Sequence, residues 1–157
     1  MAALLIVALT NGSSAQSVTD GDTLMLNGRT YQLWGIEAPD TRQVCRDGWA
    51  AGQLAAARLK ELIQGRTVVC EEMEYDRYGR MEALCRAGGE DLSAAMVREG
   101  MAWAFDRYSR DYAGQEDKAK AEGLGVHGHS CAVPWEWRAQ QRRKVLPAEE
   151  SGDGRSP

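Results

Sequence analysis

A chain of 157 residues is long enough to form a single domain with a substantial hydrophobic core. Its 43% hydrophobic and 27% charged residues exclude an intrinsically disordered chain and a membrane-embedded bundle. The formal net charge of −4 argues against binding of nucleic acid through general positive charge, so any such contact must be local, made by a few arginines or a bridging cation.

The first 15 residues are expected to form an export segment. An apolar run at 2–9 precedes small polar residues, which is the pattern of a secretory signal cleaved after Ala15. The basic residues that normally open such a signal are missing, and a buried first strand is the alternative. The run is too short to span a bilayer. We expect an exported protein, periplasmic or secreted, with a domain over 16–146 and a disordered tail over 147–157.

Two short acidic clusters flank a predicted hairpin. Their carboxylates are those of Asp20, Asp22, Glu37 and Asp40. Between them, Asn27-Gly28 is a strong hairpin signal, because a type I′ turn needs positive φ at both central residues. If residues 25–26 pair with 31–33, the clusters meet at one end of the ribbon, where hard oxygen ligands suit Ca²⁺ or Mg²⁺ better than zinc. A simple turn is the alternative for the first cluster alone.

The four cysteines allow three disulfide pairings in principle. Residues 67–75 and 80–86 are predicted as two strands joined by a tight turn. This places Cys70 nearly opposite Cys85, within the reach of a disulfide. Cys45 and Cys131 are then left as the second pair, and such bonds persist in oxidising compartments.

A zinc site is the alternative use of the last cysteine. His127, His129 and Cys131 place three soft ligands within five residues. No fourth ligand is evident nearby, so the disulfide interpretation is preferred.

Three helices are predicted, at 48–63, 92–99 and 113–122. Each has a boundary signal: Gly65 and Gly123 stop the first and third, and Asp91 can cap the second. The aromatic residues at 134–137 are expected to pack on the body as a clamp. A β-ribbon, a helix, a hairpin and two helices fit an α+β protein with a bent five-stranded barrel, for which the OB-fold is the natural candidate.

Three motifs in this order resemble the signatures of the staphylococcal nuclease family. They are VTDGDT at 18–23, LWGIEAPD at 33–40 and DRYGR at 76–80. The helix predicted after Asp91 and the clamp at 134–138 are also similar to segments of family members. The resemblance implies an OB-fold and Ca²⁺-dependent hydrolysis of DNA and RNA.

The resemblance also implies a set of Ca²⁺ ligands. By position, Asp22 and Glu37 would bind the ion directly, together with the backbone carbonyl of Ala38. Asp20 would lie behind these ligands, and Thr23 would steady the ligand loop.

The residues implied for catalysis and substrate binding lie in the second and third motifs and beyond them. Asp40 would take the place of the acid that positions or deprotonates the attacking water. Arg80 would be one of two arginines bound to the scissile phosphate. Tyr78 and Tyr108 would lie near the nucleotide, and Arg77 is placed with them as a substrate-binding residue.

Three departures from the family pattern predict lowered activity. Gln32 stands where the family has its first catalytic arginine, and loss of such a donor costs on the order of 10²–10³ in rate. Asp40 stands in place of Glu, and Glu37 in place of Asp, so both side chains differ in reach. Arg42 is a better candidate than Arg29 for the missing charge, because Arg29 lies on the opposite strand face from Gln32.

We therefore expect a monomeric, Ca²⁺-dependent nuclease of reduced activity on single-stranded DNA or RNA. The alternative is a non-catalytic OB module that binds nucleic acid or another partner through the same face. A domain that keeps the fold for stability alone is a third possibility.

Overall fold

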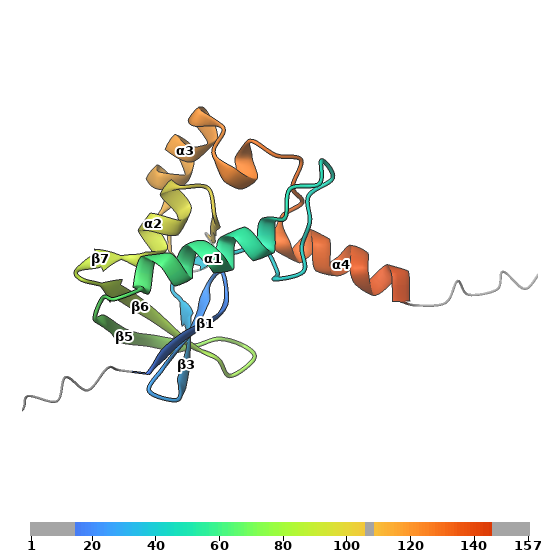
Figure 1. The fold of residues 1–157 in the computed structure, drawn as a ribbon. Helices are drawn as coiled ribbons and strands as arrows, with labels where there is room; N and C mark the ends of the chain where they lie inside the picture. The colour runs from blue at the N-terminus through green and yellow to red at the C-terminus, as the bar shows by residue number, and fades with distance from the viewer. Residues whose placement is uncertain (1–14, 106–108, 146–157) are drawn as a thin grey trace, which may run out of the picture.

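The computed structural model describes residues 15–105 and 109–145 of the chain. These residues form a mixed α+β protein (Figure 1). The strands are β1 (Gln16–Asp20), β2 (Thr23–Leu26), β3 (Arg29–Leu33), β4 (Ile36–Glu37), β5 (Val68–Tyr75), β6 (Met81–Ala87), β7 (Glu90–Asp91) and β8 (Trp103–Ala104). The helices are α1 (Ala51–Ile63), α2 (Leu92–Arg98), α3 (Ala113–Glu122), the 3₁₀-helix η1 (Gly125–His127) and α4 (Pro134–Val145).

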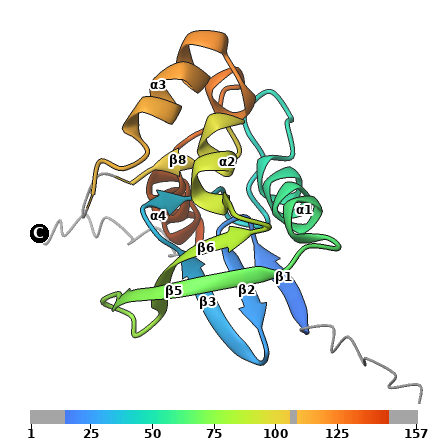
Figure 2. The ribbon, with the colours of Figure 1, turned by 90° about the vertical axis from the view of Figure 1, so that its left-hand side faces the viewer.

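The main sheet is mostly antiparallel. Its strands run in the order β1-β2-β3-β6-β5, and β7 pairs with β6. Only the pair of β3 and β6 is parallel among the ladders of the described residues. Strands β4 and β8 form a second, two-stranded sheet. Helices α1 and α2 lie on one side of the main sheet, and α3 packs on α2 (Figures 1 and 2).

The expected closed five-stranded barrel is not formed. Within the described residues, the path of paired strands ends at β1 and β5, and no hydrogen-bonded ladder joins these two strands. A side chain bridges the gap instead, because Nε2 of Gln16 donates to the carbonyl oxygens of Ile63, at 2.8 Å, and Arg66, at 3.3 Å. Strand β1 is thus tied to the end of α1 rather than to β5.

The first hairpin forms as its turn signal predicts. Asn27 and Gly28 have φ values of 52° and 80°, the left-handed region that the turn requires. The register pairs Thr23 with Gln32, so the beginning of β2 lies beside the end of β3. The backbone N–H of Leu33 donates to the carbonyl of Asp22 at 2.7 Å. Both acidic clusters therefore lie at the same end of the sheet.

The three predicted helices are present, and α1 begins three residues later than expected. Asp91 caps α2 by accepting from the N–H of Ala94 at 3.1 Å, and Gly123 ends α3 with a φ of 61°. The fourth helix, α4, was missed, because we predicted only an aromatic clamp at its start. Its polar sequence buries Pro134 alone, so no apolar periodicity marks it as a helix.

Both predicted disulfides are present. Cys70 and Cys85 face each other across β5 and β6, and Cys45 is bonded to Cys131. The bond to Cys131 removes the alternative zinc site with His127 and His129. Two disulfides suggest an oxidising, extracytoplasmic environment.

Some predictions fall outside this description. The export segment, apart from Ala15, the tail from residue 147 and the substrate residue Tyr108 all lie outside the described residues. Of the helices within the described ranges, none is both long and apolar enough to cross a bilayer.

Candidate active site

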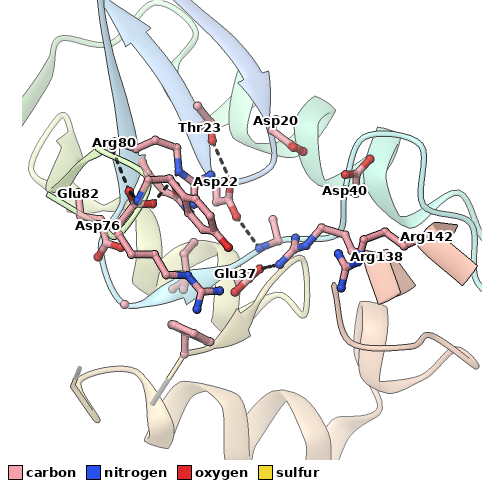
Figure 3. Close-up of a pocket in the computed structure, with 17 residues that line it drawn as sticks. Asp20, Asp22, Thr23, Glu37, Asp40, Asp76, Arg80, Glu82, Arg138 and Arg142 are labelled. Atoms are coloured by element: carbon pink, nitrogen blue, oxygen red, sulfur yellow. Dashed lines mark hydrogen bonds and ion pairs between the residues drawn. The ribbon is translucent and has the colours of Figure 1, made fainter. Parts of the chain in front are cut away.

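A pocket of about 450 Å³ opens where the two acidic clusters meet (Figure 3). It is lined by all the described residues to which the family resemblance assigns a metal-binding, catalytic or substrate-binding role. These residues are Asp20, Asp22, Thr23, Gln32, Glu37, Ala38, Asp40, Arg77, Tyr78 and Arg80. The fold thus gathers groups from β2, β3, β4 and the turn between β5 and β6 into one site.

Asp22 is the buried centre of the acidic cluster, with 7% of its surface exposed. Its Oδ2 accepts from the N–H of Ala38 at 2.8 Å, and its Oδ1 accepts from the hydroxyl of Thr23 at 2.9 Å (Figure 3). Burial raises the pKa of Asp22 to about 6, and the negative charges of Asp20 and Glu37 add to this effect against the two hydrogen bonds. A carboxylate in this environment is stabilised by a nearby cation.

Helix α1 holds both acidic loops in place through close backbone contacts. A Cβ on Gly52 of α1 would lie 1.9 Å from the carbonyl oxygen of Asp40. A Cβ on Gly21 would lie 2.7 Å from the Cβ of Ala55 on the same helix. The absence of side chains at these two glycines lets the loops approach the helix, which fixes Asp20 and Asp40 beside one pocket.

Burial also raises the pKa of Asp20, and the charge of Asp40 acts in the same direction. The hydrogen bond from the N–H of Gly21 and the positive charge of Arg138 oppose this shift. Asp40 is more accessible, with 28% of its side chain exposed, and its Oδ1 accepts from the N–H of Arg42 at 3.2 Å. The two clusters therefore act as one electrostatic unit.

Gln32 occupies a central position in the strand part of the site. It pairs in register with Thr23 on one side and with Glu82 on the other. Its Oε1 is buried and has no hydrogen-bond partner in the described part of the chain. At the position where the family resemblance implies an arginine, the pocket therefore has a neutral side chain.

Glu82, which was not predicted as a site residue, adds a further acid next to this position. Only 9% of its surface is exposed. Burial raises the pKa of Glu82, and the nearby charges of Asp76 and Glu74 raise it further. The side of the pocket formed by Gln32 and Glu82 is thus unfavourable for a phosphate.

Arg80 is held in the pocket by the turn that carries it. Oδ1 of Asp76 accepts from the backbone N–H groups of Tyr78, at 2.8 Å, and Arg80, at 2.9 Å. Oδ2 of Asp76 accepts from Nε of Arg80 at 2.7 Å, and the guanidinium lies 5.4 Å from the ring centroid of Tyr78. Asp76 therefore orients Arg80 through both its backbone and its side chain.

Arg42 does not supply the charge missing at Gln32, contrary to our expectation. Its side chain is 86% exposed and does not line the pocket, and its Nε lies 3.9 Å from Oδ1 of Asp40. Arg29 pairs with Glu72 at 2.7 Å, away from the site, as its strand face implied.

The arginines that do line the pocket from another element are Arg138 and Arg142 of α4. Arg138 donates through Nη2 to Oε1 of Glu37 (Figure 3). Neither arginine was predicted as a site residue, because the segment from residue 134 was expected only to pack on the body as an aromatic clamp. Their spacing of four residues, typical of one helix face, was the signal that could have revealed them.

Comparison with known proteins agrees with this geometry. Residues 30–127, more than half of the chain, match the family model described as staphylococcal nuclease homologue. The chain belongs to the staphylococcal nuclease family. It is 34% identical over 139 residues to a micrococcal nuclease of Shigella flexneri, an alignment that covers 77% of this chain and 76% of that protein.

Two further relatives of this nuclease family member have similar identity. One is an uncharacterized endonuclease of Haemophilus influenzae, 31% identical over 133 residues, which cover 80% of this chain and 71% of that protein. The other is a succinoglycan biosynthesis protein of Rhizobium meliloti, 34% identical over 128 residues, which cover 74% of this chain and 67% of that protein. The chain is therefore nuclease-like, and the family implies a nucleic-acid substrate.

The staphylococcal nuclease family is typically Ca²⁺-dependent, and the donor chemistry of the pocket fits a hard divalent cation. Six carboxylates and four arginines line the pocket, so a divalent cation would balance the excess negative charge. No group of three or more acidic, histidine or cysteine side chains within the described ranges is arranged as a metal site. In this arrangement Asp22 accepts hydrogen bonds from Thr23 and Ala38, and Glu37 accepts one from Arg138.

Proposed function

We propose that this protein is an exported, Ca²⁺-dependent nuclease that hydrolyses phosphodiester bonds of DNA or RNA with reduced activity. The observation that carries the proposal is the pocket itself, in which the four carboxylates of the two acidic motifs lie with Arg80. Residues 16–146 would form the functional domain, acting as a monomer on a single-stranded substrate.

Asp22, Glu37 and the carbonyl of Ala38 would hold the cation, with Asp20 behind them. When bound, a divalent cation would supply positive charge to the phosphoryl oxygens as negative charge develops on them. The hydroxyl of Thr23 restrains Asp22 through its hydrogen bond to Oδ1. A restrained carboxylate loses little conformational entropy when a cation binds, which favours the site.

Asp40 is the proposed proton acceptor for the attacking water. Its side chain is partly exposed, so water can reach it, and its Oδ1 is oriented by the N–H of Arg42. Arg80 would donate to the phosphate from the turn between β5 and β6, with its guanidinium oriented by Asp76. Tyr78 and Arg77, which line the pocket beside Arg80, would contact the neighbouring nucleotide.

The reduced activity follows from Gln32. A neutral amide cannot offset the charge that develops on the phosphate, and the buried acid Glu82 lies next to it in register. Losing one such donor costs on the order of 10²–10³ in rate.

The test is hydrolysis of denatured DNA and of RNA with Ca²⁺ and with chelator. We expect cleavage that chelator abolishes, and a Ca²⁺-dependent rise in melting temperature. Asp22→Asn should lower the rate by at least about 10²-fold and remove the thermal shift. Asp117→Asn, an exposed carboxylate on α3 outside the pocket, is the matched control and should change neither measurement. Intact substrates together with an unchanged melting temperature would overturn the proposal.

A non-catalytic binding module is the second candidate, and the pair of Gln32 and Glu82 favours it. In such a module, hydrolysis is absent because the arginine is absent, while the nucleic-acid face remains. This function predicts oligonucleotide binding that survives chelator and weakens with salt, without cleavage under any condition.

A further inference from the structure

We infer that Arg142 of α4 is a phosphate-binding residue of the pocket, which supplies from the C-terminal helix the positive charge that Gln32 does not provide. The inference rests on the proposed nucleic-acid substrate and extends it, because it assigns part of the strand-binding surface to an element outside the three motifs.

Helix α4 is fixed against the site by bonds near its start. The disulfide between Cys45 and Cys131 joins the loop after Asp40 to the segment that precedes the helix. Nε2 of Gln43 donates to the carbonyl of Ala132 at 2.6 Å. The N–H of Arg46 donates to the carbonyl of Ser130 at 3.1 Å. The loop that carries the proposed proton acceptor is therefore cross-linked to the base of α4.

The next contact lies inside the pocket. Arg138, one turn into α4, donates to Oε1 of Glu37, and this pair brings the helix against the acidic cluster (Figure 3). Arg138 also opposes the rise in the pKa of Asp20, so its charge acts on more than one carboxylate. With its guanidinium engaged by Glu37, Arg138 positions the helix.

Arg142 follows one helical turn later and lines the same pocket. Unlike Arg138, it has no hydrogen bond or ion pair with any other residue that the structure describes. An unpaired guanidinium beside a pocket rich in carboxylates is available for an anionic ligand, and its planar fork of N–H donors suits phosphate. Gln32, on the strand side of the pocket, is neutral. The ligand that fits this arrangement is the phosphodiester backbone of a single-stranded polynucleotide.

The same helix provides a matched control. Arg143 is adjacent to Arg142 and also exposed, but it does not line the pocket. Arg142→Gln and Arg143→Gln change the net charge equally, so they separate a specific contact from general electrostatics. Both positions are exposed, and circular dichroism with melting temperatures checks that both variants fold.

The experiment measures binding of a labelled single-stranded oligonucleotide by fluorescence anisotropy. It is performed in chelator, where no cation-dependent hydrolysis occurs, and with Ca²⁺ in an Asp40→Asn background. We expect Arg142→Gln to weaken binding about five-fold, and to reduce the slope of log affinity against log salt by about 0.7. Arg143→Gln should leave both quantities nearly unchanged.

Equal effects of the two variants in both conditions would overturn the inference, and so would a wild-type protein that binds no oligonucleotide in either. Hydrolysis by the wild-type protein is measured separately. If the wild-type protein cleaves and both variants bind equally well, the proposed nuclease activity stands and the role of Arg142 is wrong. If only Arg142→Gln loses binding and the wild-type protein does not cleave, the role of Arg142 stands and the proposed nuclease activity is wrong.

A double-mutant cycle tests whether Arg142 compensates for Gln32. In a Gln32→Arg background, the loss caused by Arg142→Gln should fall from about five-fold to about two-fold, because the phosphate then has a second donor. An undiminished loss would show that the two positions contact different phosphates and would overturn the compensation.

Discussion

The two walls of the pocket are built in different ways. The strand wall, formed by β2, β3, β6 and their turns, holds its groups by sheet register and by burial, as for Asp22 and Glu82. The helix wall is α4, whose two pocket arginines are more exposed and depend on a disulfide and an ion pair for their position. Backbone register fixes the acidic chemistry, whereas covalent and side-chain contacts attach the basic wall.

The walls also differ in charge. The pocket carboxylates belong to the strand wall and its adjoining loops, and that wall lacks a positive group at Gln32. The helix wall contributes only arginines. The positive charge that strand β3 lacks at Gln32 is thus present at the same pocket on a separate helix.

The disulfides provide the largest test of this comparison, because each belongs to one wall. The disulfide between Cys45 and Cys131 joins residues 86 apart in sequence, and replacing both by Ala should lower the unfolding free energy by up to ~4.5 kcal/mol. The disulfide between Cys70 and Cys85 joins residues only 15 apart, so replacing both by Ala should lower it by up to ~3 kcal/mol, because a shorter closed loop restricts the unfolded chain less. Denaturant unfolding measures both values.

The two disulfide variants should also separate in function. At a temperature where both are folded, only loss of the bond between Cys45 and Cys131 should weaken oligonucleotide binding, since that bond anchors α4. Equal weakening in both folded variants would contradict the division into two walls.

The next largest effect is expected when a positive charge is introduced into the strand wall at Gln32. Gln32→Arg should raise the rate of hydrolysis by about 10²-fold, because it returns a charged donor to the transition state. Glu82 will pair with the new arginine and limit the gain, so the double variant with Glu82→Gln should be faster still. Gln32→Met, of similar volume but without charge, is the control and should give no increase. An unchanged rate in the folded double variant would mean that the phosphate does not approach this strand.

Apart from Glu82, the strand wall was predictable because its signals are local. Asn27-Gly28 fixes the register of its hairpin, and that register brings two acidic clusters 15 residues apart to one end of the sheet. The turn at residues 76–80 likewise carries its own hydrogen bonds. The pairing of Cys70 with Cys85 followed from the same tight turn. In each case, the residues that determine the structure are neighbours in sequence.

The helix wall could not be predicted in the same way, because tertiary contacts determine its place. Arg138 and Glu37 are separated by 101 residues, and no local pattern relates them. Helix α4 is polar on nearly every face, so periodicity did not reveal it. The closed barrel failed for a related reason. Whether β1 and β5 pair depends on how far the sheet coils, which short-range signals do not specify.

The smallest test concerns the turn that orients Arg80 in the strand wall. Burial raises the pKa of Asp76, but hydrogen bonds from the backbone and guanidinium of Arg80 and from the N–H of Tyr78 outweigh it, so the pKa is lowered below its ordinary value of 3.8. A carboxyl whose pKa is lowered by folding stabilises the protein above its unfolded pKa, and this contribution is lost as the pH falls through the folded value.

Asp76→Asn keeps the Oδ1 acceptor and removes the charge, so it should lower the unfolding free energy by about 1 kcal/mol at pH 7. Urea unfolding should show this difference shrinking below about pH 4. Binding through Arg142 should be unaffected, since the hydrogen bonds and the ion pair of Asp76 go to its own turn and none joins it to α4. A difference in unfolding free energy that is constant with pH would show that the charge of Asp76 does not hold Arg80.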